Sequence, residues 1–109
     1  ESEEVVYLLC LDAKCKALDC VLIHRGGVNV ASIAARKVVK TALDANATSV
    51  VLAHNHPNGT AMPSPEDIAA TQKIFNVLKS VGIRLVDHII VAGEQAVSLK
   101  EYGAFSLLD

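Results

Sequence analysis

Two histidines and an aspartate lie at a spacing that suits a single metal ion. His54 and His56 end a short apolar run, and Asp67 follows a loop spanning 57–63. Because side chains of a strand repeat every two residues, both imidazoles can point to the same side, and the loop can bring Asp67 back toward them. Two imidazoles and one carboxylate form a typical catalytic Zn²⁺ site, with one position open for a water whose pKa falls from about 15.7 toward about 7.

Each part of this pattern also has an ordinary structural explanation. A His-x-His pair often occurs by chance in a polar loop. Ser64-Pro65-Glu66-Asp67 is a good helix start by itself, since Ser64 can cap the helix and acidic residues favour its N-terminus. It is the combination of all these residues at this spacing that favours a metal site.

The elements expected to position these residues alternate between strand and helix patterns. Apolar runs predict strands, and apolar residues at helical spacing after the candidate N-caps Ser32 and Ser64 predict helices. The expected strands are 5–11, 17–24, 48–53, 83–92 and 96–99. One expected helix follows the Ser32 cap and runs through Asp44, and the other follows the Ser64 cap and is closed by Gly82. This order predicts one α/β sandwich with a mixed β-sheet flanked by helices.

Three further titratable residues attract attention in these elements. His24 ends the second expected strand and His88 lies in the fourth, and both are expected to be structural histidines. Asp87 alternates with Leu85 and Ile89, which predicts that it points inward and bonds to the backbone or to a metal-ligand histidine.

The combined pattern resembles the JAMM (MPN+) metalloprotease signature, since His54-x-His56-Pro57 is followed by Ser64-x-x-Asp67 at the right spacing. The string at 53–59, Ala-His-Asn-His-Pro-Asn-Gly, together with Asp-His-Ile-Ile at 87–90, is similar to the RadC family of bacteria. The resemblance covers essentially the whole chain and implies a single JAB/MPN domain over 1–109, related in fold to the cytidine deaminases. RadC proteins usually carry an upstream helical segment with DNA-binding-like motifs. Because this chain lacks one and begins without Met, we expect a piece of a longer protein.

The resemblance also implies roles for residues around the metal, which it identifies as zinc held by the two histidines and the aspartate. Glu4, directly before the first strand, matches the glutamate that holds the zinc-bound water as general base. Glu1 and Glu3 lie close to it, and an ordinary solvated terminus is the alternative. Ser64 matches a serine that hydrogen-bonds the oxyanion or the water. Asn55 stands where eukaryotic deubiquitinating members carry Ser or Thr, so ubiquitin specificity does not carry over.

The function implied is zinc-dependent hydrolysis of a peptide or isopeptide bond in a peptide or protein substrate. A DNA-repair-associated module is the main alternative, but a net charge of −2, scattered basic residues and few aromatics argue against DNA binding by this chain alone. A zinc deaminase would need His-x-Glu and Pro-Cys-x-x-Cys, and neither occurs. A metal-free interaction domain is disfavoured by the intact set of ligands.

Length and composition agree with these expectations. The 109 residues are 51% hydrophobic and 20% charged, which suits one folded domain with a sizeable aliphatic core. No apolar run approaches the roughly 20 residues of a membrane span, and no signal peptide is visible. Three cysteines in strand-like sequence predict reduced core thiols in a cytoplasmic protein. No pattern specifies an oligomeric state.

Overall fold

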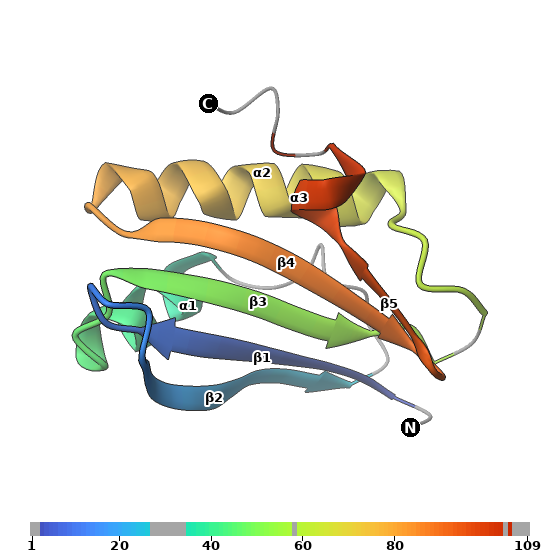
Figure 1. The fold of residues 1–109 in the computed structure, drawn as a ribbon, viewed down its shortest axis with the longest axis horizontal. Helices are drawn as coiled ribbons and strands as arrows, with labels where there is room; N and C mark the ends of the chain where they lie inside the picture. The colour runs from blue at the N-terminus through green and yellow to red at the C-terminus, as the bar shows by residue number, and fades with distance from the viewer. Residues whose placement is uncertain (1–2, 27–34, 58, 104, 106–109) are drawn as a thin grey trace.

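A five-stranded sheet of order β2-β1-β3-β4-β5 forms the centre of the computed structural model, which describes residues 3–26, 35–57, 59–103 and 105 (Figure 1). The mixed sheet with flanking helices confirms the α/β prediction. The elements are β1 (Glu4–Leu11), β2 (Ala17–Gly26), α1 (Ala35–Asp44), β3 (Ser49–Asn55), α2 (Pro65–Ser80), β4 (Arg84–Ala92), β5 (Gln95–Ser98) and α3 (Leu99–Tyr102).

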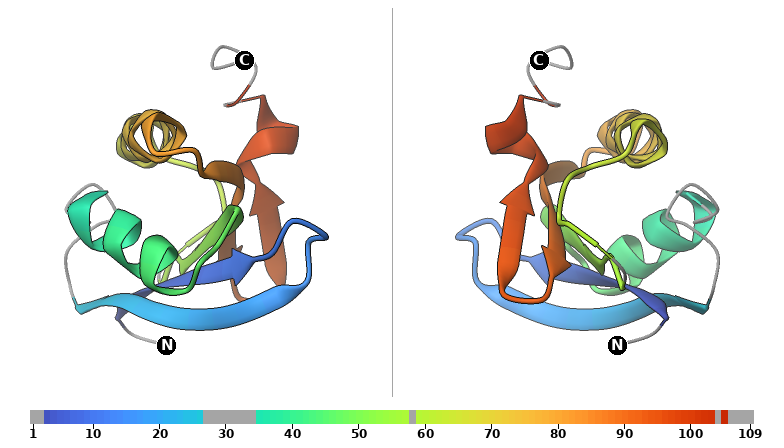
Figure 2. Two further views of the ribbon diagram at one scale, coloured as in Figure 1. Left: turned by 90° about the vertical axis from the view of Figure 1, so that its left-hand side faces the viewer. Right: turned by 90° about the vertical axis from the view of Figure 1, so that its right-hand side faces the viewer.

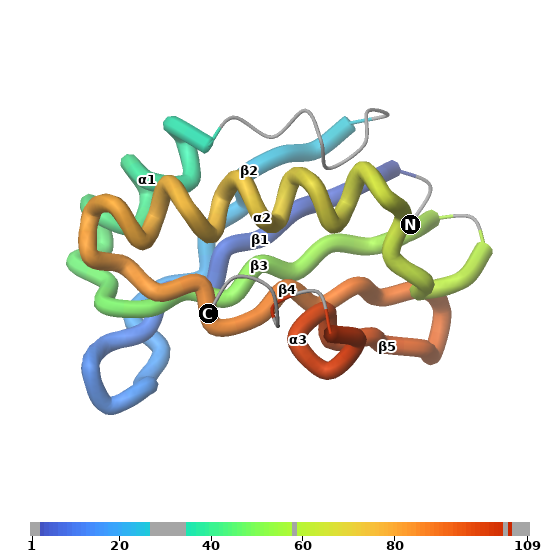
Figure 3. Tube along the Cα trace, turned by 90° about the horizontal axis from the view of Figure 1, so that it is seen from above, coloured from blue at the N-terminus to red at the C-terminus, as the bar shows by residue number. Residues whose placement is uncertain are grey.

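The strand directions explain where the ends of the elements meet. β1 is antiparallel to both β2 and β3, β3 is parallel to β4, and β4 is antiparallel to β5. A parallel pair needs a crossover connection, and α2 provides it. The N-terminus of α2 consequently lies near the carboxyl end of β3 (Figure 3).

Both long helices cover the same side of the sheet (Figure 2). Along β1 the fully buried residues are every second one, Val6, Leu8 and Cys10, and they join one core cluster with Val38 of α1 and Leu78 of α2. Because residues directly opposite each other in an antiparallel pair share a face, their partners on β3 also point toward the helices. His54, opposite Val6, is the last residue in this row on β3.

The structure corrects one predicted strand end and confirms one predicted helix end. Leu99 was expected to end a strand, but it is buried as the first residue of α3, which begins because the Ser98 hydroxyl accepts the N–H of Glu101. The second helix ends at Ser80, and Gly82, which was predicted to close it, has a positive φ of 79° that reverses the chain. The predicted cap at Ser32 lies outside the described residues.

The structure bears on two expectations drawn from composition, one about the cysteines and one about membrane spans. The three cysteines are free, but only Cys10 is a core thiol, because Cys15, between β1 and β2, and Cys20, on β2, are exposed. In the described part of the chain, no helix is both long and apolar enough to cross a membrane.

Candidate metal centre

The structure brings together the residues predicted as metal ligands. His54 ends the buried row of β3, His56 follows the strand, and Asp67 lies in the first turn of α2. One nitrogen from each histidine and one carboxylate oxygen all lie within 4.8 Å of one another. The Nε2 atom of His54 is 3.5 Å from Oδ1 of Asp67, and Nε2 of His56 is 3.0 Å from Oδ2.

A reciprocal cap at the start of α2 holds the aspartate in this position. The Ser64 hydroxyl oxygen accepts the backbone N–H of Asp67 at 3.0 Å, and the Asp67 carboxylate accepts the backbone N–H of Ser64 at 2.8 Å. Pro65 occupies the first helical position, where its missing N–H costs nothing. Because the serine oxygen acts as an acceptor in this cap, its hydroxyl hydrogen can be donated elsewhere.

The Asp67 side chain, only 3% exposed, is charged despite its burial. Burial by itself raises the pKa of this carboxyl. The His54 imidazole and the N–H and hydroxyl of Ser64 outweigh that effect and hold the pKa well below its usual range. A buried carboxylate anion faces both imidazoles.

The ring orientation of His56 is set by its other nitrogen. Nδ1 lies 2.9 Å from the backbone carbonyl of Thr60, which can only accept, so Nδ1 carries the hydrogen. In the neutral ring, Nε2 then presents a lone pair toward Asp67. The His56 side chain is 20% exposed, and it borders a hollow of about 340 Å³ together with Pro57, Val91 and other residues. The centre is therefore reachable from this side.

The buried Nε2 of His54 tests whether a metal fits the site. The His54 side chain is fully buried, and this nitrogen is one of two buried side-chain polar atoms in the described residues that make no hydrogen bond. An unsatisfied buried nitrogen costs about 1–3 kcal/mol, and a bound cation would remove that cost. Since its neighbours are another imidazole and a carboxylate, the residues present fit a metal ion such as Zn²⁺.

A bulge in β4 adds a residue to this centre that the strand pattern did not predict. The β3–β4 ladder pairs Val50 with Leu85 but Val51 with Asp87, so Val86 is an extra residue. After the bulge, His88 faces the helices, where it is fully buried with Nε2 2.6 Å from Nδ1 of His54. His88 is thus a buried, hydrogen-bonded histidine outside the ligand group, as expected, and one of its partners is a candidate ligand.

The same bulge overturns the inward orientation expected for Asp87. Its carboxylate does bond to backbone, accepting the N–H groups of His88 and Lys100, but it also accepts the hydroxyl of Ser98. Asp87 therefore holds the start of α3 through hydrogen bonds and does not bond to a ligand histidine. His24, on β2 opposite Val6, is outside the metal-ligand group.

His88 should make the stability of the metal-free chain depend on pH. Burial, and then the nearby His54, lower the pKa of His88 from 6.5 to about 3. Between these values the unfolded chain binds the extra proton, so the free energy of unfolding should fall as the pH drops below about 6.5. The contribution of Asp67 is lost only below its ordinary pKa of 3.8. Urea unfolding between pH 7.5 and about 4.5 therefore covers the range in which His88 acts and stays above that of Asp67.

The variant His88→Gln supplies the comparison for this prediction. It removes the titrating ring, so its free energy of unfolding should change less across the same range, whatever its stability at pH 7.5. An equal change in both proteins would show that His88 is not the group responsible.

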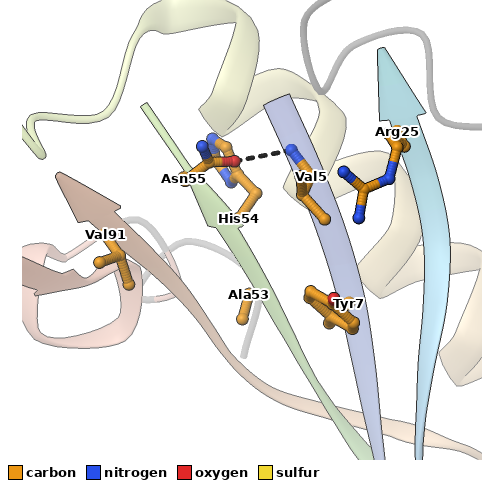
Figure 4. A pocket seen from close by; sticks show the side chains of 7 residues that line it. All are labelled: Val5, Tyr7, Arg25, Ala53, His54, Asn55 and Val91. Carbon is orange, nitrogen blue, oxygen red and sulfur yellow. Dashed lines mark hydrogen bonds between the residues drawn. The ribbon is translucent and has the colours of Figure 1, made fainter. Parts of the chain in front are cut away.

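Glu4, predicted as the general base, begins β1 on the same face as the metal-ligand group. Val6 lies opposite His54, and continuing this register by two residues places Glu4 opposite His56. The side chain of Asn55 fixes the backbone on both sides of Glu4. Its Oδ1 accepts the N–H of Val5 at 2.6 Å (Figure 4), and its Nδ2 donates to the carbonyl of residue 3 at 2.8 Å.

Glu3 has a different environment from Glu4. Its carboxylate lies 3.9 Å from the guanidinium of Arg25, which is paired with Val5. Side chains of β1 at odd positions point away from the helices, and those of Val5 and Tyr7 border a hollow on that side (Figure 4). Glu3 therefore lies on the face of the sheet away from the metal-ligand group, unlike Glu4. Glu1 lies outside the described residues.

An α/β sandwich with this His-x-His pair at a strand end and an aspartate in the next helix belongs to the JAB/MPN class of domains. Residues 1–104 match the family described as the RadC-like JAB domain, and the chain belongs to this family.

Curated relatives include UPF0758 proteins of Bordetella avium, 47% identical over 95 residues, and of Pseudoalteromonas translucida, 44% identical over 101 residues. These alignments cover 87% and 93% of this chain but 42% and 45% of the relatives. The chain thus spans less than half the length of the curated relatives it matches.

Proposed function

We propose that this domain is a zinc-dependent hydrolase that cleaves a peptide or isopeptide bond. One observation carries the proposal: lone-pair atoms of His54, His56 and Asp67 converge within 4.8 Å beside Ser64. Three protein ligands are the number found in catalytic zinc sites, whereas structural zinc sites use four. The exposed edge of His56 and the adjoining hollow provide room for a substrate.

Each residue has a role that its surroundings support. Bound zinc would polarise a carbonyl and lower the pKa of water. Glu4, held from both sides by Asn55, takes the proton of the attacking water and passes it to the leaving amine. The Ser64 hydroxyl donates a hydrogen bond to the carbonyl oxygen as negative charge develops there. Asp67 remains ionised throughout because its pKa is so low.

A library experiment tests the activity without a known substrate. The zinc-loaded chain is incubated with peptides from a digested bacterial proteome and with peptides joined through a lysine side chain. Cleavage of ordinary bonds creates new α-amino groups, and cleavage of isopeptide bonds creates new lysine amines, which mass spectrometry distinguishes. The expected result is zinc-dependent release of one of these amines. Release of neither in any library would overturn the hydrolase proposal.

Ser64→Ala should separate a catalytic serine from a helix cap. It removes the hydrogen donated to the developing oxyanion, so cleavage should slow by roughly 10²–10³. It also removes the cap of α2, so the free energy of unfolding should fall by about 1 kcal/mol. Zinc content should be unchanged, because Ser64 is not one of the proposed ligands. If the cleavage rate per folded molecule stays at the wild-type level, Ser64 is only a cap.

A further inference from the structure

A chain of three buried hydrogen bonds connects two of the candidate metal ligands through residues outside the ligand group. The Thr71 hydroxyl lies 2.7 Å from the backbone carbonyl of Asp67 and 2.6 Å from Nδ1 of His88. Nε2 of His88 then lies 2.6 Å from Nδ1 of His54. Thr71 and His88 are at most 1% exposed, so water does not compete for these bonds.

The chemistry of these groups determines the direction of each bond. A carbonyl can only accept, so the Thr71 hydroxyl donates its hydrogen to Asp67, and its oxygen must accept Nδ1–H from His88. The neighbours bonded to the buried His88 ring are a hydroxyl and an imidazole. Because neither is an anion, the ring is neutral and has a lone pair on Nε2. That lone pair accepts Nδ1–H from His54.

In the neutral His54 ring, this sequence of donors leaves Nε2 without a hydrogen, facing Asp67. If the Thr71 hydroxyl were absent, the His88 ring could carry its hydrogen on Nε2 instead and donate it to His54. The hydrogen of His54 would then move to Nε2 and occupy the position where a metal would bind. A single hydroxyl therefore determines which nitrogen of His54 is free.

We propose that Thr71 and His88 are positioning residues that hold His54 in the tautomer able to bind a metal, while Thr71 also ties the backbone of Asp67 to the same network. The inference rests on the proposed function only in that it takes the group as a metal site. It assigns to Thr71 and His88 an effect on metal affinity that side chains serving only to pack the core would not have. Loss of a partner that orients a metal-ligating histidine typically costs about 10–100-fold in metal affinity.

Two substitutions at Thr71 distinguish this role from packing. Thr71→Val keeps the shape of the side chain and removes the hydroxyl, whereas Thr71→Ser keeps the hydroxyl and removes a buried methyl group. If Thr71 only packs, Thr71→Ser, which lacks the buried methyl group, should lose more stability and zinc affinity than Thr71→Val. If it sets the tautomer, zinc affinity should fall about 10–100-fold in the valine variant and change by less than about threefold in the serine variant.

The experiment measures zinc affinity by competition with a chromophoric chelator, after circular dichroism has shown that each variant is folded. Long-range ¹H–¹⁵N spectra of the metal-free proteins report which nitrogen of His54 carries the hydrogen. The expected result is Nδ1–H in the wild type and in Thr71→Ser, and a shift toward Nε2–H in Thr71→Val.

Unchanged zinc affinity in folded Thr71→Val would overturn the proposal, and so would Nε2–H on His54 in the metal-free wild type. The wild-type spectrum keeps the proposal falsifiable if Thr71→Val does not fold. Failure of the hydrolase proposal has a different signature, because zinc binding and the tautomers can be as expected while no library peptide is cleaved.

Discussion

His56→Ala is expected to abolish stoichiometric zinc binding. The wild-type chain, expressed with zinc, should hold about one zinc per molecule, because the set of three protein ligands is complete. Removing one of these ligands should cost more than the 10–100-fold that loss of an orienting partner typically costs. His56 is the best ligand to remove because its partly exposed side chain leaves the core intact, whereas His54 is fully buried. Elemental analysis and chelator competition measure the effect.

His24→Ala is the matched control for this experiment. His24 lies on the same face of the sheet, opposite Val6, but two strands away from β3, which is about 10 Å at ordinary strand spacing. The His24→Ala variant should keep its zinc, and its thermal unfolding should respond to chelator as that of the wild type does. Equal zinc in His56→Ala and the wild type, or none in the wild type, would remove the assignment of the metal site.

The convergence of the candidate ligands was predictable because each of its determinants is local. The two-residue period of a strand puts His54 and His56 on one side, and the Ser-Pro-x-Asp start of α2 places Asp67 in the first turn. The parallel β3–α2–β4 connection then brings the two ends together. The resemblance to a known signature depends on the same residues.

The role of His88 was not predictable in the same way, because a bulge has no strong local signal in this strand. An uninterrupted strand would put Leu85, Asp87 and Ile89 on one face, which is why Asp87 was expected to point inward. The extra residue at Val86 reverses the alternation and turns His88 toward His54 instead. A fully buried histidine in the core, touching a ligand, becomes visible only once the register of β3 against β4 is known.

The assignment of Glu4 lies between these cases, since its face is determined by the register of β1 but its role comes from the resemblance. His54 lies opposite Val6, so Glu4, two residues before Val6, lies on the same face of the sheet as His54. Asn55 hydrogen-bonds the backbone on each side of Glu4. The hydrogen bonds of Asn55 also suggest why an amide suits this position. A Ser or Thr hydroxyl is too short to bridge an N–H and a carbonyl two residues apart as Asn55 does.

Glu4→Gln is expected to reduce cleavage by roughly 10²–10⁴, the usual contribution of a positioned general base. The substitution keeps the size of the side chain and removes only its ability to take a proton. Zinc content and fold should be retained, because Glu4 is not among the three proposed ligands. The rate is measured as zinc-dependent release of new amines from the peptide library that the wild type cleaves, with zinc determined on the same samples.

Glu3→Gln is the neighbouring control, and it should leave the rate nearly unchanged. Its carboxylate lies near Arg25 on the face of the sheet away from the metal-ligand group, so it cannot replace Glu4 without reversing the strand. A crystal structure with zinc provides the geometric test, in which the Glu4 carboxylate should lie within about 5 Å of the metal, one water away. A Glu4 side chain directed into solvent beside an ordered zinc, or full activity of Glu4→Gln, would mean that another group takes the proton.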